Sequence, residues 1–273
     1  MNVRRLNRVL GCIGWGILAV FALAALFAPR LAPYPPSTLS KPMAPPSPAH
    51  PLGTNDIGYD VLTELLYGAR TSLLLGTLAA TFSTLIGLVL GVIAGYYSRL
   101  GFAIMRGVDI FLAVPRLPLI IFLAAFLKPG FWTLILFFAL LGWMRTTRVV
   151  SSQILSEREK DYVKAAIAMG ARDPRILIHH LLPGTIGITI MRFIVDFQHV
   201  ILAESGLSFL GLGDPTLKSW GAILHYAFEY PTIFTSDLWL RWAAPAGLCI
   251  TLVVLALTLI GFSMDARSNP RLR

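Results

Sequence analysis

Five ionisable side chains interrupt long apolar runs of the chain, and their types and spacing are those that could carry chemistry. They are Asp109, Arg116, Arg192, Asp196 and Glu204. Arg192 and Asp196 stand four residues apart, so on a helix they lie on one face and can form an ion pair. Charges inside apolar segments are costly and usually face a protein interior or an aqueous cavity. Neutralisation within the fold and a place on a transport path therefore both stay open for these residues.

Two of these charges have distinctive neighbours. Arg116 lies between Pro115 and Pro118, and two prolines so close together predict an opened helix whose freed carbonyl groups face a water-filled cavity. Asp109 follows Arg106 by three residues, the spacing of a pair on one helical face. We therefore expect Arg116 to lie beside a polar path and Asp109 to pair with Arg106.

The constellations typical of an enzyme are missing from the sequence. It has no G-x-x-x-x-G-K-[ST] run, which is the usual loop for nucleotide phosphates. Asp60 and Glu64 fall in a polar segment, where solvated carboxylates are common. His179 and His180 are adjacent, so they point in different directions on a helix and make a poor metal pair. We therefore predict no catalytic residue, no metal site and no cofactor bound by this chain.

The elements that hold these residues are apolar enough to cross a membrane. Of the 273 residues, 56% are hydrophobic and 14% charged, and the mean hydropathy is +0.70; a soluble domain has about 45–50% apolar and about 25% charged residues. This composition excludes an ordinary soluble enzyme, a disordered chain and a disulfide scaffold. The formal charge of +9 fits a membrane protein, because Lys and Arg gather in cytoplasmic loops. No nucleic-acid partner is expected, and the lipid bilayer is.

Six apolar stretches have the length of a transmembrane helix, which is about 20 residues. They cover residues 10–28, 72–96, 104–127, 131–150, 183–203 and 238–262. A signal peptide is the alternative for the first stretch, but its apolar core would be shorter. Fifteen Lys and Arg residues on the N-terminal side of the membrane against six on the other satisfy the positive-inside rule with both termini in the cytoplasm. We predict an all-α membrane protein with six transmembrane helices.

The segments between these helices define the expected domain organisation. Residues 1–9 form a cytoplasmic N-terminus, 10–29 the first transmembrane helix and 30–69 an external segment, in which many prolines exclude helix. A core transmembrane domain is expected over residues 70–263 and a cytoplasmic tail over 264–273.

The region before the last span has a mixed composition. Residues 204–237 predict a loop with short apolar pieces. Trp220, Trp239 and Trp242 lie in or near it, and we expect them to act as anchors at the membrane–water interface.

Small residues recur every four positions in the second predicted span. They are Ser83, Gly87, Gly91 and Gly95. Residues four apart lie on one face of a helix, so this pattern lets another helix approach closely, as in GxxxG packing. A chance run in a chain with 23 glycines is the alternative. We expect this face to be buried against a helix of this subunit or of a partner.

The longest polar stretch, residues 151–180, belongs to a predicted cytoplasmic coupling loop over residues 151–183, and residues 157–183 of this loop predict a docking element. Connections between helices usually take about 2–8 residues, so a longer patterned stretch suggests a function. Residues 161–169 predict a short helix that stops at Gly170, and residues 175–182 predict a second one that ends at Pro183. A solvated charged loop is the alternative.

This stretch resembles the EAA loop of ABC-transporter permeases, whose pattern is E-A-A-x-x-x-G and, nine residues later, I-x-L-P. Lys164 stands at the acidic position and His180 at the isoleucine position, and the other letters and the spacing match. The resemblance implies that this loop couples the chain to an ATPase. The coupling residues would be Lys164, Ala165, Ala166, Gly170, His180, Leu182 and Pro183.

Other stretches resemble the second permease subunit of dipeptide, oligopeptide and nickel importers. They cover residues 50–61, 66–70, 105–109, 201–213, 219–221 and 269–273, with Tyr59 where that family usually has Arg. The resemblance spans the whole chain and implies a type I ABC importer permease fold in the inner membrane of a bacterium or archaeon. The implied partners are a second permease, two nucleotide-binding ATPase subunits holding ATP and Mg, and an external solute-binding protein. The implied solute is a dipeptide, an oligopeptide or a metal chelate.

Two other functions are the alternatives for a chain of this composition. A stand-alone ion-coupled secondary transporter predicts internal repeats and charged relays near the membrane midplane, and we see no repeat between residues 1–136 and 137–273. A membrane receptor or scaffold would leave the small-residue face unexplained. The expected function is therefore that of a permease subunit.

Overall fold

The structure, a computed structural model, describes residues 3–127 and 130–268, and these ranges fold into a bundle of helices without a β-strand. Five helices or helical runs are long and apolar enough to cross a membrane, or six if the bent pair α4–α5 counts as one span. The predicted all-α membrane fold is thus confirmed. The run Lys128-Pro129-Gly130 predicts a tight turn, but residues 128–129, like the motif at 269–273, lie outside the described residues.

The bundle is built from five long helices and several short ones. The long helices are α1 (Val3–Leu26), α3 (Val61–Tyr96), α6 (Phe131–Arg158), α9 (Leu182–Phe209) and α12 (Ala243–Ser268). The short ones are α2 (Ala28–Leu31), α4 (Ser98–Ala113), α5 (Arg116–Phe126), α7 (Asp161–Ala168), α8 (Asp173–Ile176), α10 (Trp220–Glu229) and α11 (Leu238–Arg241), with a π-helical turn, η1 (Leu177–Leu181), between α8 and α9.

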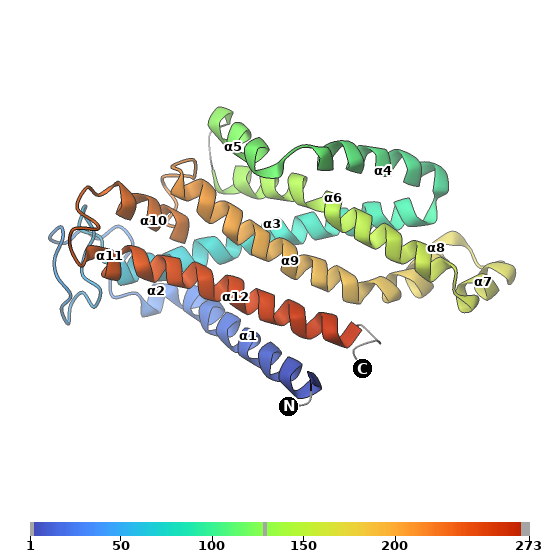
Figure 1. The fold of residues 1–273 in the computed structure, drawn as a ribbon, viewed down its shortest axis with the longest axis horizontal. Coiled ribbons are helices and arrows are strands. Elements are labelled where there is room, and N and C mark those ends of the chain that lie inside the picture. The colour runs from blue at the N-terminus through green and yellow to red at the C-terminus, as the bar shows by residue number, and fades with distance from the viewer. Residues whose placement is uncertain (1–2, 128–129, 269–273) are drawn as a thin grey trace.

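Helix α3 packs most extensively against α6 and α9, while α1 lies along α12 (Figure 1). Helices α7 and α8 occupy one end of the bundle, which we call the α7 end. The start of α1 and the end of α12 point toward this side. The segment before α3, together with α10 and α11, occupies the opposite end, which we call the α10 end.

The third predicted span is broken in two. Helix α4 ends at Ala113, α5 begins at Arg116, and the two helices are bent by 84°. Val114 is extended, with φ −83° and ψ 127°, because a residue before proline is forced out of the helical region. The predicted interruption of this span at the prolines is confirmed, and α4 begins at Ser98, earlier than the predicted start at residue 104.

The fifth span is longer than predicted at both ends. Its first residues follow η1, where the N–H of Leu182 donates to the carbonyl of Leu177. This five-residue bond lets the chain stay helical up to Pro183, which has no N–H to donate. The helix therefore does not begin afresh at Pro183. At its other end α9 continues to Phe209, so Glu204 lies in a helix and the loop predicted over residues 204–237 is wrong there and at α10.

The segment before α3 is folded by its own polar side chains. The Oδ1 atom of Asn55 accepts hydrogen bonds from the backbone N–H groups of residues 57–59 at 2.8–3.0 Å. Asp60 caps α3 by accepting from the N–H of Thr63 at 2.8 Å. Asp60 and Glu64 are 3% and 8% exposed, so the expectation of solvated carboxylates is wrong. Helix α3 starts inside the predicted external segment because of this cap.

Candidate functional site

The small-residue face of α3 lies against α6. An added Cβ at Gly87, Gly91 or Gly95 would come within 2.6–2.7 Å of a side-chain carbon of α6, which real contacts do not allow. The side chains met are those of Thr146, Val150 and Ile154, which also recur every four residues. Ser83 has no exposed surface and faces Gly142 in the same way. This contact, the α3–α6 seam, buries the small-residue face within the subunit.

Asp196 of α9 lies at the centre of a buried hydrogen-bond network at this seam. The Nη2 atom of Arg192 donates to Asp196 Oδ1 at 2.9 Å. The hydroxyls of Thr146 and Ser83 donate to Asp196 Oδ2 at 3.0 and 3.3 Å. Asp196 is 2% exposed, so its negative charge is balanced by these partners inside the fold. Of the two roles left open for these two residues, the contacts favour neutralisation.

Asp109 has a different partner from the one expected. It pairs with Arg148 of α6, while the guanidinium of Arg106 lies 5.0 Å from the ring centre of Phe102. The prediction of an Arg106 pair is wrong because α4 packs beside α6, which offers an arginine across the helix contact. This pair is about half exposed in the isolated subunit.

Arg116 lies beside the same network. Its charge interacts with those of Asp196, Arg145 and Arg192, and these four charges also act on His199. Arg116 and Arg145 line a cavity of about 160 Å³ at the break between α4 and α5. We call Ser83, Arg116, Arg145, Thr146, Arg192, Asp196 and His199 the polar centre. Sequence reasoning missed Arg145, Thr146 and His199, although the four-residue spacing of Arg192 to Asp196 predicted one pair.

Glu204 lies apart from the polar centre, toward the α10 end. It is 2% exposed and accepts a hydrogen bond from Ser208 at 2.8 Å. The expectation for two of the tryptophans is wrong. Trp220 is fully buried and donates to the carbonyl of Leu65 at 3.1 Å, and Trp242 is 2% exposed, so neither is an interface anchor.

The predicted docking element, residues 157–183, is held to the α7 end by a few buried contacts. Val163 and Ala166 are 0% and 4% exposed, and Val163 belongs to the same apolar cluster as Val150 and Ile154 of α6. Glu157 at the end of α6 accepts hydrogen bonds from Lys160 and Tyr162, both at 2.8 Å. Burial and the Glu157 bond together raise the pKa of Tyr162. Ala166 thus serves the internal anchor and is not free for a partner.

The outer side of this element is exposed and partly apolar. Ala165, Ile167 and Met169 are exposed, Met169 to 82%. Gly170 has a φ of +79° and nothing within 4 Å of an added Cβ, so it supplies the left-handed turn that ends α7. Lys164 forms an ion pair with Glu159 at 3.0 Å.

The sequence-predicted residues at the end of this element take different positions. The His180 ring stacks with that of Tyr162, with 6.3 Å between centroids. Leu182 and Pro183 form the first turn of α9. Together, an exposed helix and its short link of residues 169–172 to the helical run of α8, η1 and α9 can pass a displacement from a partner into the bundle.

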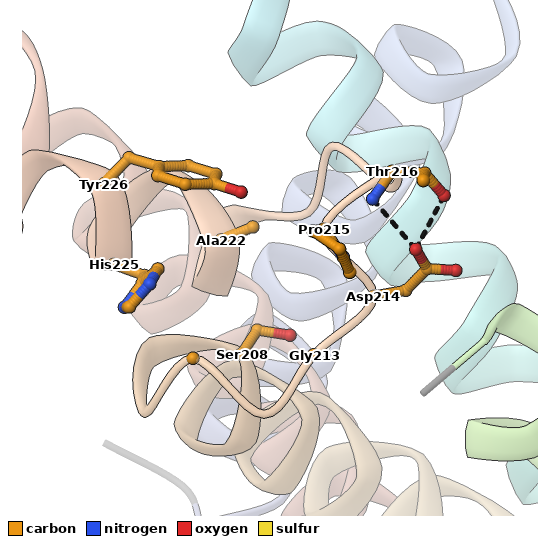
Figure 2. A pocket seen from close by; sticks show the side chains of 9 residues that line it. Ser208, Gly213, Asp214, Pro215, Thr216, Ala222, His225 and Tyr226 are labelled. Atoms are coloured by element: carbon orange, nitrogen blue, oxygen red, sulfur yellow. Dashed lines mark hydrogen bonds between the residues drawn. The ribbon is translucent and has the colours of Figure 1, made fainter. Parts of the chain in front are cut away.

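A pocket opens at the α10 end, on the far side of the molecule from α7. It has a volume of about 520 Å³ and lies between the end of α9 and the start of α10 (Figure 2). His225 and Tyr226 line one side, and Asp214 lies opposite, where its Oδ1 accepts from the N–H and the hydroxyl of Thr216 at 2.8 and 2.6 Å.

Tyr59, which stands where the second permease subunits that this chain resembles usually have Arg, also lies at this end. The Nζ atom of Lys218 lies 3.5 Å from the ring centre of Tyr59 and 3.0 Å from Glu64 Oε1. A cation over an aromatic ring is attracted to it. Tyr59 therefore holds the loop before α10 against the start of α3.

Comparisons with known proteins agree with this architecture. Residues 87–273 match the family described as binding-protein-dependent transport system inner membrane component. The chain belongs to this family. It is 35% identical to the dipeptide transport system permease protein DppC of Bacillus subtilis, over 99% of this chain and 85% of that protein. It is 34% identical to the oligopeptide permease OppC of the same bacterium and 35% to the di/tripeptide permease DppC of Pseudomonas aeruginosa, over 97% of this chain and 86% and 88% of those proteins.

Family membership confirms the resemblance drawn from the motifs. The chain is a multi-pass inner membrane permease subunit of an ABC transporter, and it works in a complex with other subunits. Its family is a membrane component of transport systems rather than a group of enzymes.

Proposed function

We propose that this chain forms half of the translocation path of an ATP-driven importer for dipeptides or oligopeptides. The other half is a second permease, two ATPase subunits hold ATP and Mg and hydrolyse the nucleotide, and an external solute-binding protein delivers the peptide. The relatives named above support peptides as the solute.

The coupling role rests on one observation, the exposed helix α7 joined by the short turn at residues 169–172 to the continuous helical run that begins at Asp173. Helix α7 has an exposed apolar side around Ile167 and Met169, outside the spans, where burial by a partner would be favourable. Each ATPase subunit offers a groove for such a helix in this proposal. Lys164, Ala165 and Gly170 lie at this contact, while Ala166 anchors α7 from inside.

Displacement of α7 would reach the membrane through the helices that follow it. Helix α8, the π turn and α9 form one apolar run over Asp173–Phe209, so a push at its first turn is not absorbed by a flexible joint. The run ends beside the pocket of the α10 end. Closure of the ATPase subunits would thereby tilt α9 and change access at both ends.

The proposed orientation puts the α7 end and both termini in the cytoplasm. Residues 30–60 and the 520 Å³ pocket would then face the solute-binding protein. Single cysteines at Ser47 and Ser156, both exposed, test this in a background with Cys12 and Cys249 replaced by serine. A membrane-impermeant maleimide added outside should label Ser47→Cys only. Labelling of Ser156→Cys alone would show that the orientation is the opposite of the proposed one.

The function itself is tested by purification and transport. The chain should copurify with two kinds of subunit, a second permease and an ATPase. In proteoliposomes with the solute-binding protein, the complex should import a dipeptide in step with ATP hydrolysis. A chain that purifies alone and imports peptide with an ion gradient but no ATP would contradict the proposal and favour the secondary-transporter alternative.

A further inference from the structure

Two arginines of the polar centre carry positive charge that the fold does not neutralise. The carboxylate of Asp196 attracts the charge of Arg116, but it already bonds to Arg192 at 2.9 Å and to two hydroxyls. Over residues 3–127 and 130–268, neither Arg116 nor Arg145 forms an ion pair. A charge inside a membrane-spanning region normally has a partner or faces a water-filled cavity.

Both side chains line a cavity with unused hydrogen-bond donors. The cavity has a volume of about 160 Å³ and is otherwise lined mainly by apolar residues such as Leu119 and Met144. Among the described residues, the Nε atom of Arg116 is buried and has no hydrogen-bond partner. A buried donor left unpaired costs about 1–3 kcal/mol, more for a charged group, so a rotation of the Arg116 side chain that lets a ligand accept this bond would be favoured.

The backbone adds to the positive potential at this point. Arg116 is the first residue of α5, whose axis is bent by 84° from that of α4. The first N–H groups of a helix have no acceptor within the helix, and its dipole favours an anion there. In membrane transporters, broken helices aim such half-helix starts at anionic groups of the solute.

The side of the bundle on which these arginines lie cannot face lipid. Arg145 lies near the middle of α6 and is exposed in the single subunit. Arg148, three residues after Arg145 on α6, pairs with Asp109 of α4, and this pair is half-exposed. Exposed charges at this depth belong to a surface that faces a second subunit or the solute path.

We propose that Arg116 and Arg145 form a carboxylate-binding subsite on the solute path, which takes the C-terminal carboxylate of the translocated peptide. This inference rests on the proposed function. Arginine guanidinium groups match a carboxylate with two parallel hydrogen bonds. The cavity is large enough for the carboxylate end of a peptide, so the rest of the peptide would lie in the space shared with the second permease.

The test measures binding to the assembled complex without the solute-binding protein, so that protein's selectivity does not enter. The probes are alanyl-phenylalanine and its C-terminal amide, titrated onto the nucleotide-free complex in lipid nanodiscs. The wild-type complex should bind the acid more tightly than the amide. R116Q and R145Q should each weaken binding of the acid roughly tenfold or more, as expected when a charge-assisted hydrogen bond is lost, and leave binding of the amide unchanged.

Two sets of variants separate this role from a structural one. R116K and R145K keep the charge and should lose less affinity for the acid than the glutamine variants. R148Q removes a neighbouring arginine whose charge Asp109 balances, and it should change acid and amide binding equally. Equal losses for acid and amide in R116Q and R145Q, or no preference of the wild type for the acid, would overturn the subsite.

Peptide import by the same complex distinguishes this inference from the proposed function. If wild-type complex imports alanyl-phenylalanine with ATP but binds acid and amide alike, the subsite is wrong and the function stands. If it imports no peptide at all in the presence of the solute-binding protein, the proposed function fails and the subsite with it.

Discussion

Glycine serves opposite purposes in the α3–α6 seam and at the end of α7. At Gly91 an added Cβ would lie 2.7 Å from Val150 Cβ, so glycine is there because another helix fills the space. At Gly170 nothing lies within 4 Å, but φ is +79°, so glycine is there because other L-residues rarely adopt this backbone. The first makes two helices a single close-packed unit; the second shapes an exposed contact.

This difference divides the subunit into a part that must stay fixed and a part that must meet a partner. Substitutions in the seam should act on folding and assembly. Substitutions in residues 157–183 should act on transport and leave the folded subunit intact. Four variants test this division, from the largest expected effect on stability to the smallest.

Asp196→Ala should destabilise the subunit most, because it leaves Arg192, whose side chain is only 16% exposed, without its partner and frees two hydroxyls of the seam. Breaking a buried pair costs about 3–5 kcal/mol. The apparent Tm of the complex in detergent measures the loss. Replacing both partners, as in Asp196→Leu with Arg192→Met, should recover part of the lost stability. An unchanged Tm for Asp196→Ala alone would show that Asp196 does not stabilise the seam.

Gly91→Leu should come next, since the new side chain would overlap Val150 and push α3 from α6. Overpacking of this kind costs about 1–3 kcal/mol, sometimes more. Size-exclusion profiles of the complex should show poor assembly. Gly16→Leu is the matched control, because nothing lies within 4 Å of an added Cβ at Gly16 of α1. Normal assembly of the Gly91 variant would mean that the seam is not close-packed.

Gly170→Val should have a smaller effect on stability. A left-handed non-glycine residue costs about 1–2 kcal/mol, and the strain here falls in an exposed turn. Transport should nevertheless fall roughly tenfold, because a strain of this size changes the position of α7. Uptake and ATP hydrolysis are measured together in proteoliposomes. Gly170→Asn, which tolerates this backbone better, should keep more uptake. Equal uptake in the valine and asparagine variants would show that backbone strain at Gly170 does not matter.

Lys164→Ala should have the smallest effect, because its ion pair with Glu159 is exposed and such pairs contribute little. We expect uptake within about twofold of wild type. The hydrogen bond from Lys164 lowers the pKa of Glu159, so the small stabilisation is present above the ordinary pKa of Glu and is lost as the pH falls through the lowered one. A Tm difference between wild type and variant that grows toward acid pH would contradict this assignment.

Patterns that repeat along one helix were predictable from the sequence. The four-residue period of Gly87, Gly91 and Gly95 identified the face that α6 covers, and the spacing of Arg192 and Asp196 identified their pair. Both follow from the geometry of a single helix.

Contacts between helices were not predictable in the same way. Asp109 pairs with Arg148 and not with Arg106, because the position of α4 beside α6 is a property of the whole bundle. Ala166 faces the bundle for the same reason, although nothing in the local sequence separates it from the exposed Ala165. The prolines around Arg116 predicted the break but could not give the 84° bend.

The π turn at Leu177–Leu181 holds one residue more than an α-helical turn would. A bond from the N–H of Leu182 to the carbonyl of Leu177 spans one residue more than an α-helical bond. The extra residue is taken up by widening a single turn, so the chain before and after it stays nearly in the phase of one continuous helix. Deleting a residue within the π turn should therefore leave the direction of α7 almost unchanged, whereas deleting one within the α-helical part of α9 would turn the preceding chain by about 100° and shift it by about 1.5 Å. The π turn is thus the place in this run where chain length can vary without redirecting the contact with the partner.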